Sequence, residues 1–191
     1  MKKLMLMAGG QGSGKGTMAQ KILLDNPNFK YVETGAMLRA LPDESPLKQI
    51  MARGEFVPDA DLCNLLNEKI VPGHDTILDG FPRQLSQAQW LLMNFAHKFD
   101  TVAVYLNISR DLMEKRIKQR LTEGAGRADD ADKAVVQRRL DSFFNKTVPA
   151  LDWLKNSKQV KFLDIPIRDV SIEENYATLT NILRKNNVIT R

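Results

Sequence analysis

The sequence predicts a single α/β domain built on a parallel sheet. Short apolar segments alternate with longer segments of helical periodicity along nearly the whole chain, a pattern typical of βαβ units. The first apolar segment ends in a glycine-rich turn, and a helical pattern follows that turn. Hydrophobic residues make up 43% of the 191 residues, which is enough for the core of one domain of ordinary size.

The alternation places each element in turn. We expect strands over residues 3–8, 30–33, 76–79, 101–106 and 159–164. We expect helices over residues 15–25, 84–96, 109–121, 134–156 and 172–186. The last helix carries Ile172, Tyr176, Leu179 and Leu183 on one face, which we expect to pack on the sheet. Two segments interrupt the alternation, the helical excursion 35–72 and the Gly/Asp/Arg-rich stretch 122–132, and we interpret both as moving parts over a site at the strand ends.

The glycine-rich turn has the features of a phosphate-binding loop. Residues 9–17 read Gly-Gly-Gln-Gly-Ser-Gly-Lys-Gly-Thr, directly after the apolar run of residues 4–8. Glycines let the backbone turn tightly and present successive N–H groups to a polyphosphate, and Lys15 adds a mobile positive charge. The helix that follows contributes its positive N-terminal dipole. A glycine-rich turn without a binding function is the alternative, but the position between a strand and a helix favours phosphate binding.

The third expected strand ends in an acidic group. Asp79 closes the apolar run that begins at Thr76, and Arg83 follows four residues later. A lone Asp at a strand end is often only a helix cap or a turn former. Next to a phosphate-binding loop, it stands where such proteins keep a carboxylate for the Mg²⁺ shell, so we expect Asp79 to act there.

Arginines are more numerous than one triphosphate requires. Arg116 and Arg120 are four residues apart on an expected helix and share a face, beside an apolar stripe of Met113, Ile117 and Leu121. A solvated basic face is the alternative interpretation. Further arginines occur at positions 127, 138 and 139. A reaction between two phosphate-bearing molecules would explain the excess, because their mutual repulsion must be neutralised.

Composition limits the partners and the compartment. The net charge is +5 with no run of basic residues, which favours a small polyanion over nucleic acid. No segment approaches the ~18 consecutive apolar residues of a membrane span, and the apolar start is too short for a secretory signal. Cys63 is the only cysteine, so no internal disulfide and no cysteine-caged zinc is expected. We therefore expect a protein of the cytoplasm or an organelle matrix, without membrane or nucleic-acid partners. Because the sequence shows no extended interface patch, we expect a monomer.

Five blocks of sequence resemble the adenylate kinases of the nucleoside monophosphate kinase family, over nearly the whole chain and in that family's order. The blocks are residues 9–17, residues 34–39, residues 54–59, residues 78–83 with Gln87, and residues 126–130 followed by Arg139 and Leu140. The resemblance implies a P-loop NTPase fold: a five-stranded parallel sheet flanked by helices, with a helical NMP-binding insertion and a short lid. The core would comprise residues 1–33, 73–121 and 134–191, the insertion about 34–72, and the lid about 122–133.

The resemblance also implies roles for individual residues. ATP would be held by Gly12, Ser13, Gly14, Lys15, Gly16 and Thr17 around its phosphates, with Arg116 against the base and Arg120 on the phosphates. AMP would be held by Thr34, Gly35, Arg39, Val57, Gly80, Arg83 and Gln87, with Arg127 and Arg139 closing over both phosphate chains. The catalytic charges would be Lys15, Arg83, Arg120, Arg127 and Arg139. Asp79 would hold Mg²⁺ through water, and Asp129 and Asp130 would be hinge or latch partners in the lid.

The implied reaction is reversible, Mg²⁺-dependent transfer of the ATP γ-phosphoryl group to AMP, giving two ADP. Thr34 and Gln87 favour adenine, since UMP/CMP kinases typically carry Ala and Asn there, and a mismatched base would leave polar groups unpaired. A UMP/CMP-type or broad monophosphate kinase is one alternative. A non-catalytic nucleotide-binding regulatory protein is another. Asn145-Lys146 begins a guanine-reading motif but lacks its Asp, so a GTPase is disfavoured.

Departures from the family pattern bear on the metal, the insertion and the lid. Ala36 stands where the family usually has an Asp that contacts hydrated Mg²⁺, and the chain is about five residues shorter between Thr34 and Gly54. An extra residue before Leu140 leaves both Arg138 and Arg139 eligible for the lid role, and we prefer Arg139. Six residues separate Arg120 from Arg127, a short lid without zinc ligands. The distant His74 and His97 are expected to be surface residues.

Overall fold

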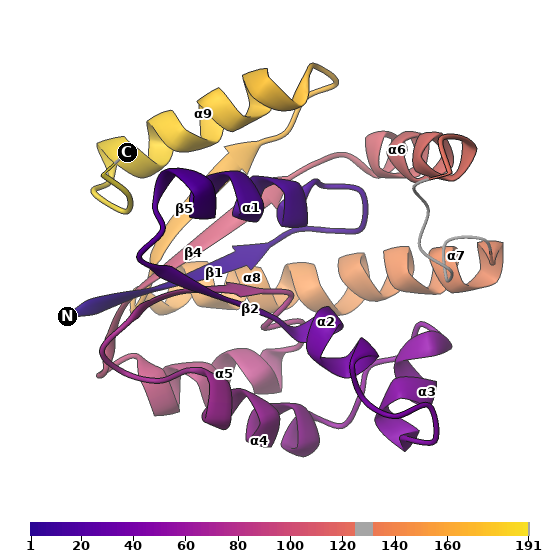
Figure 1. Cartoon of the computed structure of the whole chain (residues 1–191), viewed down its shortest axis with the longest axis horizontal. Coiled ribbons are helices and arrows are strands. Elements are labelled where there is room, and N and C mark those ends of the chain that lie inside the picture. The colour runs from indigo at the N-terminus through magenta and orange to yellow at the C-terminus, as the bar shows by residue number, and fades with distance from the viewer. Residues whose placement is uncertain (125–131, 191) are drawn as a thin grey trace.

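A five-stranded parallel sheet forms the centre of the molecule in a computed structural model, which describes residues 1–124 and 132–190 (Figure 1). The strands are β1 (Lys2–Ala8), β2 (Phe29–Glu33), β3 (Asp75–Asp79), β4 (Phe99–Asn107) and β5 (Lys161–Pro166), in the order β2-β3-β1-β4-β5. All neighbouring strands pair in parallel. The predicted strands and the predicted α/β fold of the P-loop NTPase type are confirmed.

The middle strand β1 is apolar and buried from Leu4 to Ala8 because helices cover both faces of the sheet, whereas the edge strands β2 and β5 carry charged residues. Alternate residues of β1 enter two separate cores: Leu4 and Leu6 belong to one, Met5 and Met7 to the other. The Met5 core is closed by α1 (Lys15–Asp25) and α9 (Ile172–Lys185), and the expected apolar face of α9 packs there. The Leu4 core is closed by α4 (Asp59–Lys69), α5 (Leu85–Phe95) and α8 (Val148–Ser157), as Figure 1 shows.

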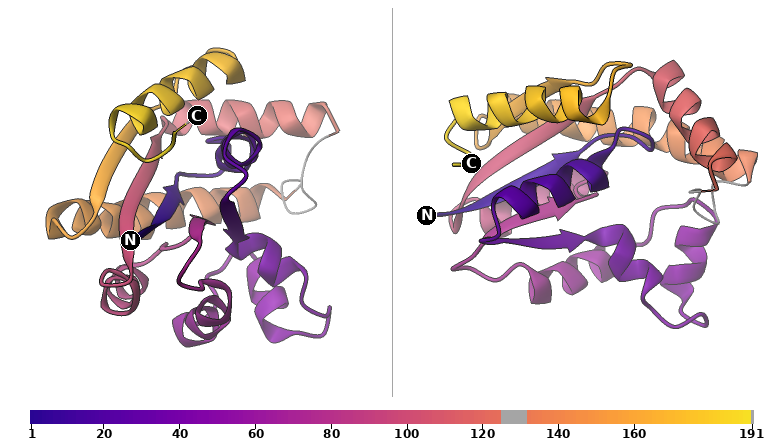
Figure 2. Two further views of the ribbon diagram at one scale, coloured as in Figure 1. Left: turned by 60° about the vertical axis from the view of Figure 1, so that its left-hand side comes forward. Right: turned by 45° about the horizontal axis from the view of Figure 1, so that its top comes forward.

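Three helices follow β2 before the chain returns to β3. They are α2 (Thr34–Arg39), α3 (Pro46–Ala52) and α4, and they confirm the helical excursion expected over residues 35–72. Pro46 starts α3, where its missing N–H costs no hydrogen bond. α3 contains no buried residue, and Figure 2 shows α2 and α3 at one end of the molecule.

Helix α6 (Arg110–Thr122) follows β4, with Ser109 as its N-cap. Of the apolar stripe on this helix, Met113 and Ile117 are buried and Leu121 is 38% exposed. Burial ends before Leu121 because α6 extends past the core at its C-terminal end (Figure 1).

The long helix predicted over residues 134–156 is made of three consecutive parts. Helix α7 (Lys133–Ser142) is capped at its N-terminus by Asp132, whose carboxylate accepts from the N–H of Ala134 at 2.8 Å. A π-helical segment, η2 (Phe143–Thr147), leads directly into α8. Residues 125–131 and 191 lie outside the described residues, so the roles expected of Arg127, Asp129 and Asp130 concern positions that the structure does not describe.

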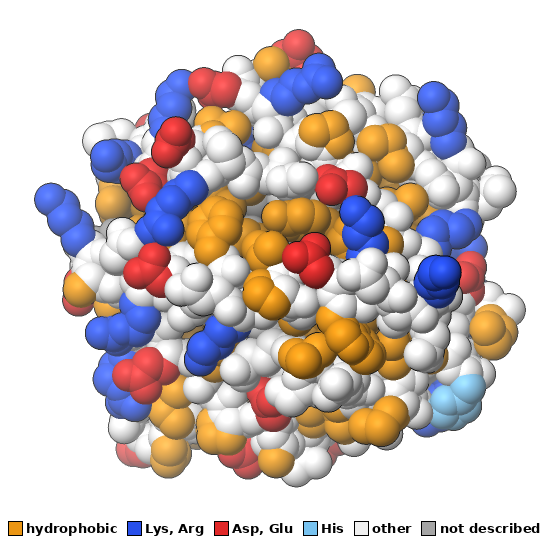
Figure 3. All heavy atoms as spheres, turned by 180° about the vertical axis from the view of Figure 1, so that it is seen from behind, with side chains coloured by type: hydrophobic (Ala, Val, Ile, Leu, Met, Phe, Trp, Pro, Cys, Tyr) orange, Lys and Arg blue, Asp and Glu red, His pale blue; other side chains and the backbone are white. Residues whose placement is uncertain are grey.

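The face opposite to Figure 1 carries interspersed acidic and basic side chains around a central area of hydrophobic ones (Figure 3). His74 and His97 are exposed, as expected. Within the part of the chain that the structure describes, every helix is too short or too polar to cross a membrane.

Candidate active site

A cavity of about 660 Å³ lies at the carboxyl ends of β1 and β3. Parallel strands place their following loops at one edge of the sheet, so segments distant in sequence meet there. The glycine loop, the end of β2 with α2, the segment after β3, and helices α6 and α7 all contribute lining residues. Their charged members are Lys15, Glu33, Arg39, Glu55, Asp79, Arg83, Arg116, Arg120, Glu123 and Arg139.

The glycine loop turns in the way that the sequence predicted. Gly12 and Gly14 have φ values of +82° and +87°, and a Cβ on Gly12 would lie 2.9 Å from the carbonyl oxygen of Met113. Helix α1 begins at Lys15, so the N–H groups of its first turn have no partner within the helix. The Lys15 ammonium donates to the carbonyl oxygens of Gly9 at 2.6 Å and Gly10 at 3.3 Å. The Lys15 side chain thus folds back over the glycine loop and is held by carbonyl oxygens at the start of that loop.

The expected phosphate-contacting residues around the loop do not all lie at the cavity surface. Gly12, Gly14, Lys15, Gly16 and Thr17 line the cavity. Ser13 is fully buried, and its backbone N–H donates to the carbonyl oxygen of Gly10 at 3.1 Å. Its contribution is therefore to the shape of the loop.

Asp79 is almost fully buried at the end of β3, and a tyrosine holds it. The hydroxyl of Tyr31 donates to Oδ2 of Asp79 at 2.9 Å and has a longer contact of 3.5 Å to Oε2 of Glu33. Burial raises the pKa of Tyr31 well above its usual range, and the negative charges of Asp79 and Glu33 raise it further. The hydroxyl therefore stays protonated and available as a donor. Sequence reasoning missed Tyr31; the signal was its position two residues before the end of a strand beside Asp79.

The segment after β3 brings Thr34, Gly80 and Arg83 together. The Thr34 hydroxyl donates to the carbonyl oxygens of Gly80 at 3.1 Å and Asp79 at 3.2 Å. Nε of Arg83 donates to the Gly80 carbonyl at 2.7 Å. A Cβ on Gly80, whose φ is +84°, would lie 2.7 Å from Thr34 Oγ1 and 2.8 Å from Arg83 Nη2. Arg83 and Gly80 line the cavity, while Thr34 is buried behind Gly80.

Arg39 lines the cavity from the last turn of α2. Its Nη2 donates to Oε1 of Glu33 at 2.7 Å. Gly35 lies under this ion pair, since a Cβ there would be 3.0 Å from Arg39 Nη1 and 3.3 Å from Glu33 Oε1. Gly35 therefore provides the space that the pair occupies.

Gln87 and Val57 are buried and lie outside the cavity lining. The amide oxygen of Gln87 accepts from the N–H of Arg83 at 2.7 Å, and its amide nitrogen donates to Oδ1 of Asp59 at 2.7 Å. Both ends of the amide are therefore held by protein groups. Val57 is 5% exposed, and its neighbour Phe56 lines the cavity.

Arg116 and Arg120 both line the cavity, which contradicts a wholly solvated basic face on α6. Arg116 Nη2 donates to the carbonyl oxygen of Arg168 at 2.8 Å. Burial lowers the pKa of Arg116, and the negative charge of Asp169 partly opposes that effect. The guanidinium remains charged at neutral pH because its ordinary pKa is far higher.

Comparison with known proteins shows the family of the chain. The sequence model of the family described as adenylate kinase matches residues 7–159. The chain belongs to the adenylate kinase family.

Individual adenylate kinases are similar over most of their length. The adenylate kinase of Prochlorococcus marinus is 31% identical over 172 residues, covering 86% of this chain and 91% of the relative. That of Parvibaculum lavamentivorans is 34% identical over 174 residues, covering 84% and 83%. Adenylate kinase isoenzyme 1 of Oryctolagus cuniculus is 30% identical over 158 residues, covering 78% and 79%. The chain is accordingly an enzyme of the nucleoside monophosphate kinase class.

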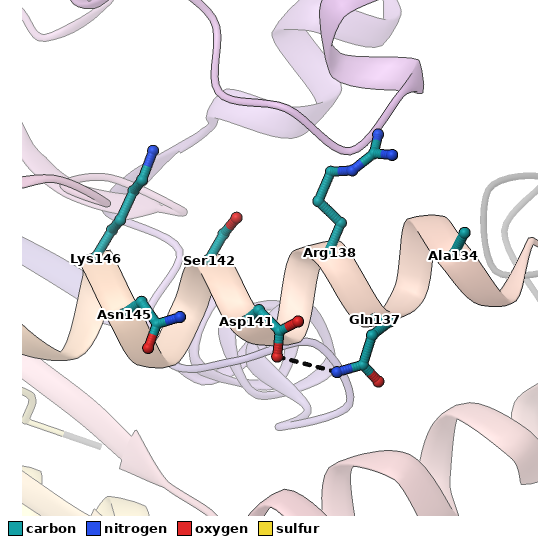
Figure 4. Close-up of a pocket in the computed structure, with 7 residues that line it drawn as sticks. All are labelled: Ala134, Gln137, Arg138, Asp141, Ser142, Asn145 and Lys146. Carbon is teal, nitrogen blue, oxygen red and sulfur yellow. Dashed lines mark hydrogen bonds between the residues drawn. The ribbon is translucent and has the colours of Figure 1, made fainter.

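The two adjacent arginines of α7 point to different places, which bears on the lid position of this adenylate kinase family member. Arg139 lines the main cavity, and its Nη2 donates to the carbonyl oxygen of Met51 at 3.4 Å. Arg138 instead donates to the carbonyl oxygen of Arg53 and lies 3.9 Å from Oε1 of Glu55. It lines a more open hollow of about 440 Å³ with Asn145 and Lys146 (Figure 4). The geometry places Arg139, and not Arg138, at the candidate active site.

Donor chemistry at the cavity suits a hydrated Mg²⁺ ion. The Asp79 carboxylate and the Thr17 hydroxyl supply oxygen atoms beside the glycine loop, and oxygen is the ligand that this ion prefers. Within residues 1–124 and 132–190, no group of three or more His, Cys, Asp or Glu side chains is arranged to hold a metal by itself.

Asn175 holds a loop that borders the cavity, and sequence reasoning did not identify this residue. It is 2% exposed, and its amide nitrogen donates to the carbonyl oxygens of Arg168, Val170 and Ser171, at 3.1, 3.4 and 3.2 Å. Its amide oxygen accepts from the N–H of Arg168 at 3.0 Å. The loop held in this way contributes Val170 to the cavity and accepts the Arg116 hydrogen bond. The signal was a polar residue on the apolar stripe of α9.

Proposed function

We propose that this chain catalyses the reversible transfer of the γ-phosphoryl group of ATP to AMP, giving two ADP. The observation that carries the proposal is that one cavity is lined both by the glycine loop with Lys15 and by the guanidinium groups of Arg39, Arg83, Arg120 and Arg139. A site for a single triphosphate would not need this number of positive charges. A site that holds a donor and an acceptor phosphate side by side would need them, because the two phosphates repel each other.

The chemistry needs no side-chain nucleophile. A phosphate oxygen of AMP forms a bond to the γ-phosphorus, the bond between that phosphorus and the β–γ bridging oxygen breaks, and ADP leaves. AMP already carries a negative oxygen, so no general base has to remove a proton. The work of the protein is to align the two oxygens and to stabilise the charge on the transferring group with preorganised cations.

ATP would occupy the glycine-loop side of the cavity. The loop N–H groups and Lys15 would hold its phosphates, with Ser13 shaping the loop, and Arg116 and Arg120 would contact the base and the phosphates from α6. Asp79 and Thr17 would hold hydrated Mg²⁺, which neutralises charge on the phosphates when it is bound.

AMP would occupy the side formed by α2 and the segment after β3. Arg39 and Arg83 would bind its phosphate, and Gly35, Gly80 and Val57 would shape the surface around it. Reading of the adenine edge by Gln87 would require its amide to exchange Asp59 for the base, since both ends of the amide are engaged within the protein.

Residues 34–72 would close over AMP, and residues 122–133 would act as a short lid that brings Arg127 and Arg139 onto both phosphate chains. Arg139 contacts the carbonyl oxygen of Met51 in the insertion, which supports coupled movement of the two parts. Asp129 and Asp130 would be latch partners within the lid.

We further propose a monomer that acts in a reducing compartment such as the cytoplasm. The only cysteine, Cys63, is buried and free, which suits a reducing compartment. Sedimentation velocity tests the monomer directly, with a single species near 21.6 kDa expected.

Substitution of Lys15 tests the transfer reaction. Lys15→Ala should lower kcat for ADP formation from Mg-ATP and AMP by at least about 10²-fold, the order expected for removing a preorganised charge from the transferring group. Lys21→Ala is the matched control and should retain activity, because Lys21 is on the same helix but contacts Glu173 and the Tyr176 ring away from the cavity. Turnover of Lys15→Ala at the rate of the control would contradict the proposal.

Base selection separates the proposed reaction from that of a UMP/CMP-type kinase. The double variant Thr34→Ala, Gln87→Asn should lose preference for AMP over CMP and UMP, because the hydroxyl at position 34 is removed and the amide at position 87 is drawn back by one methylene. Unchanged kcat/KM ratios for the three acceptors would exclude these two residues from base reading.

A further inference from the structure

Four side chains form a continuous series of polar contacts from the acceptor side of the cavity to the metal side. Arg39 Nη2 lies 2.7 Å from Glu33 Oε1, Tyr31 Oη lies 3.5 Å from Glu33 Oε2, and Tyr31 Oη lies 2.9 Å from Asp79 Oδ2. We name this series the Arg39–Asp79 relay, which comprises Arg39, Glu33, Tyr31 and Asp79. Its two end residues and Glu33 line the cavity.

The strand register forces the two carboxylates of the relay to be neighbours. Glu33 ends β2, Asp79 ends β3, and the two residues are Cα partners in the parallel pairing. Two negative charges in such proximity repel each other unless cations or donors compensate them. Arg39 compensates Glu33, and Tyr31 donates its proton to Asp79 through the shorter of its two contacts.

Tyr31 can serve only one carboxylate fully, because a phenol has a single proton to donate. Glu33 therefore depends on Arg39 for its compensation while Tyr31 serves Asp79. The ion pair has a reserved space over Gly35, where any Cβ would press on both partners. The first turn of α2 offers no further carboxylate, since position 36 is an exposed alanine.

A phosphate on Arg39 would change this balance. A phosphate dianion competes with Glu33 for the same guanidinium donors, and bidentate phosphate contacts are among the strongest that arginine makes. Glu33 then loses its compensating charge and lies beside Asp79 as an uncompensated carboxylate, while Tyr31 still donates to Asp79. The edge of the sheet becomes more negative at the place where a hydrated cation would sit.

We propose that Glu33 is a positioning residue that couples binding of the two substrates. When the acceptor phosphate binds Arg39, the Glu33 carboxylate is freed from its ion pair. The freed carboxylate, which Tyr31 connects to Asp79, adds negative charge beside Asp79 and so strengthens binding of Mg²⁺-nucleotide. This inference rests on the proposed function, because it takes Arg39 as a ligand of the AMP phosphate. It gives Glu33 the role of supplying negative charge near the hydrated Mg²⁺ ion, since the chain has an alanine and not a carboxylate at position 36.

The test measures equilibrium binding constants and does not depend on catalysis. Isothermal titration calorimetry measures the Kd of Mg²⁺ with AMP-PNP, a non-hydrolysable ATP analogue, in the absence and presence of saturating AMP. In the native chain AMP should tighten Mg²⁺-AMP-PNP by about 5-fold or more, within the usual range of coupling between two sites. With EDTA in place of Mg²⁺ the tightening should disappear, because the freed charge acts on the cation.

Two substitutions and one control locate the coupling. Glu33→Gln should reduce the ratio of the two Kd values to about 1, and Tyr31→Phe should reduce it at least 2-fold relative to the native chain. Glu55→Gln removes another cavity-lining carboxylate, one paired with Arg53 and outside the relay, and should keep the native ratio. A role of Glu33 limited to holding β2 and α2 in place would alter both Kd values together and leave their ratio unchanged.

The outcomes separate failure of the relay from failure of the proposed function. If AMP binds the native chain but does not tighten Mg²⁺-AMP-PNP, or tightens it equally in Glu33→Gln, the relay is overturned. If Glu33→Gln does not fold, a native ratio in Tyr31→Phe overturns it. If AMP does not bind the native chain at all, it is the proposed function that fails.

Discussion

The amide nitrogen of Gln87 donates to Oδ1 of Asp59 at 2.7 Å, which joins the start of α5 to the start of α4. Gln84 and Ser86 donate to the same carboxylate. The other end of the Gln87 amide accepts from the backbone N–H of Arg83 at 2.7 Å. Asp59 thus connects the insertion to the segment that carries a proposed phosphate ligand.

Replacement of Asp59 should loosen this connection. Asp59→Ala leaves the buried Gln87 amide nitrogen without its partner, which costs about 1–3 kcal/mol of unfolding free energy. Urea denaturation measures the loss, and KM for AMP should rise as the segment before Arg83 becomes less fixed. Asp61→Ala is the control, since Asp61 is exposed in the same first turn of α4. Equal losses in the two variants would show that only the interaction with the helix dipole was removed.

Gly80 should tolerate no side chain. Gly80→Ala combines a positive φ, which costs about 1–3 kcal/mol for a non-glycine residue, with contacts to Thr34 and Arg83 below 3 Å. Gly73→Ala is the matched control, because Gly73 has a φ of +101° and nothing within 4 Å of an added Cβ. Denaturation and kcat should both be affected more strongly at position 80. Equal effects at the two positions would mean that backbone strain alone matters.

Loss of the Asn175 amide should affect one substrate selectively. Asn175→Ala removes four hydrogen bonds to the loop of Arg168, Val170 and Ser171 and should cost about 2 kcal/mol. Because this loop borders the side of the cavity proposed for ATP, KM for ATP should rise while KM for AMP stays near its native value. Thr178→Ala on the same helix is the control. A parallel rise in both KM values would contradict the assignment of that side to ATP.

Cys63 should be chemically inert in the folded chain. Burial and, to a smaller extent, the negative charge of Asp59 raise the pKa of the thiol to about 11. A thiol-disulfide reagent such as DTNB should therefore label the native chain very slowly at pH 8 and rapidly in urea. The folded state retains this proton where the unfolded chain releases it, so the contribution of Cys63 to stability is complete below about pH 9 and is lost between about pH 9 and 11. Rapid labelling of the native chain at pH 8 would contradict the burial of Cys63.

Backbone features of this chain were predictable because they depend on local sequence. Continuous apolar runs identified buried strands such as β1, and the glycines of residues 9–16 identified the loop and the start of α1. The cavity itself followed from the rule that parallel strands place their loops at one edge. Periodicity showed which face of α6 is apolar but not where the core beneath it ends, which the structure places before the partly exposed Leu121.

Side-chain partners were less accessible to sequence reasoning. The bonds of Gln87 with Asp59 and of Tyr31 with Asp79 join residues that are 28 and 48 positions apart, and they depend on how α4, α5, β2 and β3 pack. Spacing alone could not choose between Arg138 and Arg139. Adjacent residues on a helix point about 100° apart, so the choice requires the orientation of α7 in the fold.

The most direct test of the account is the rate of ADP formation from Mg-ATP with AMP, CMP, UMP and GMP as competing acceptors, measured over a Mg²⁺ titration. We expect turnover with AMP far above that with the other three acceptors, and we expect it to depend on Mg²⁺. Preference for CMP or UMP would contradict the proposed acceptor, and nucleotide binding without turnover would contradict the proposed catalysis.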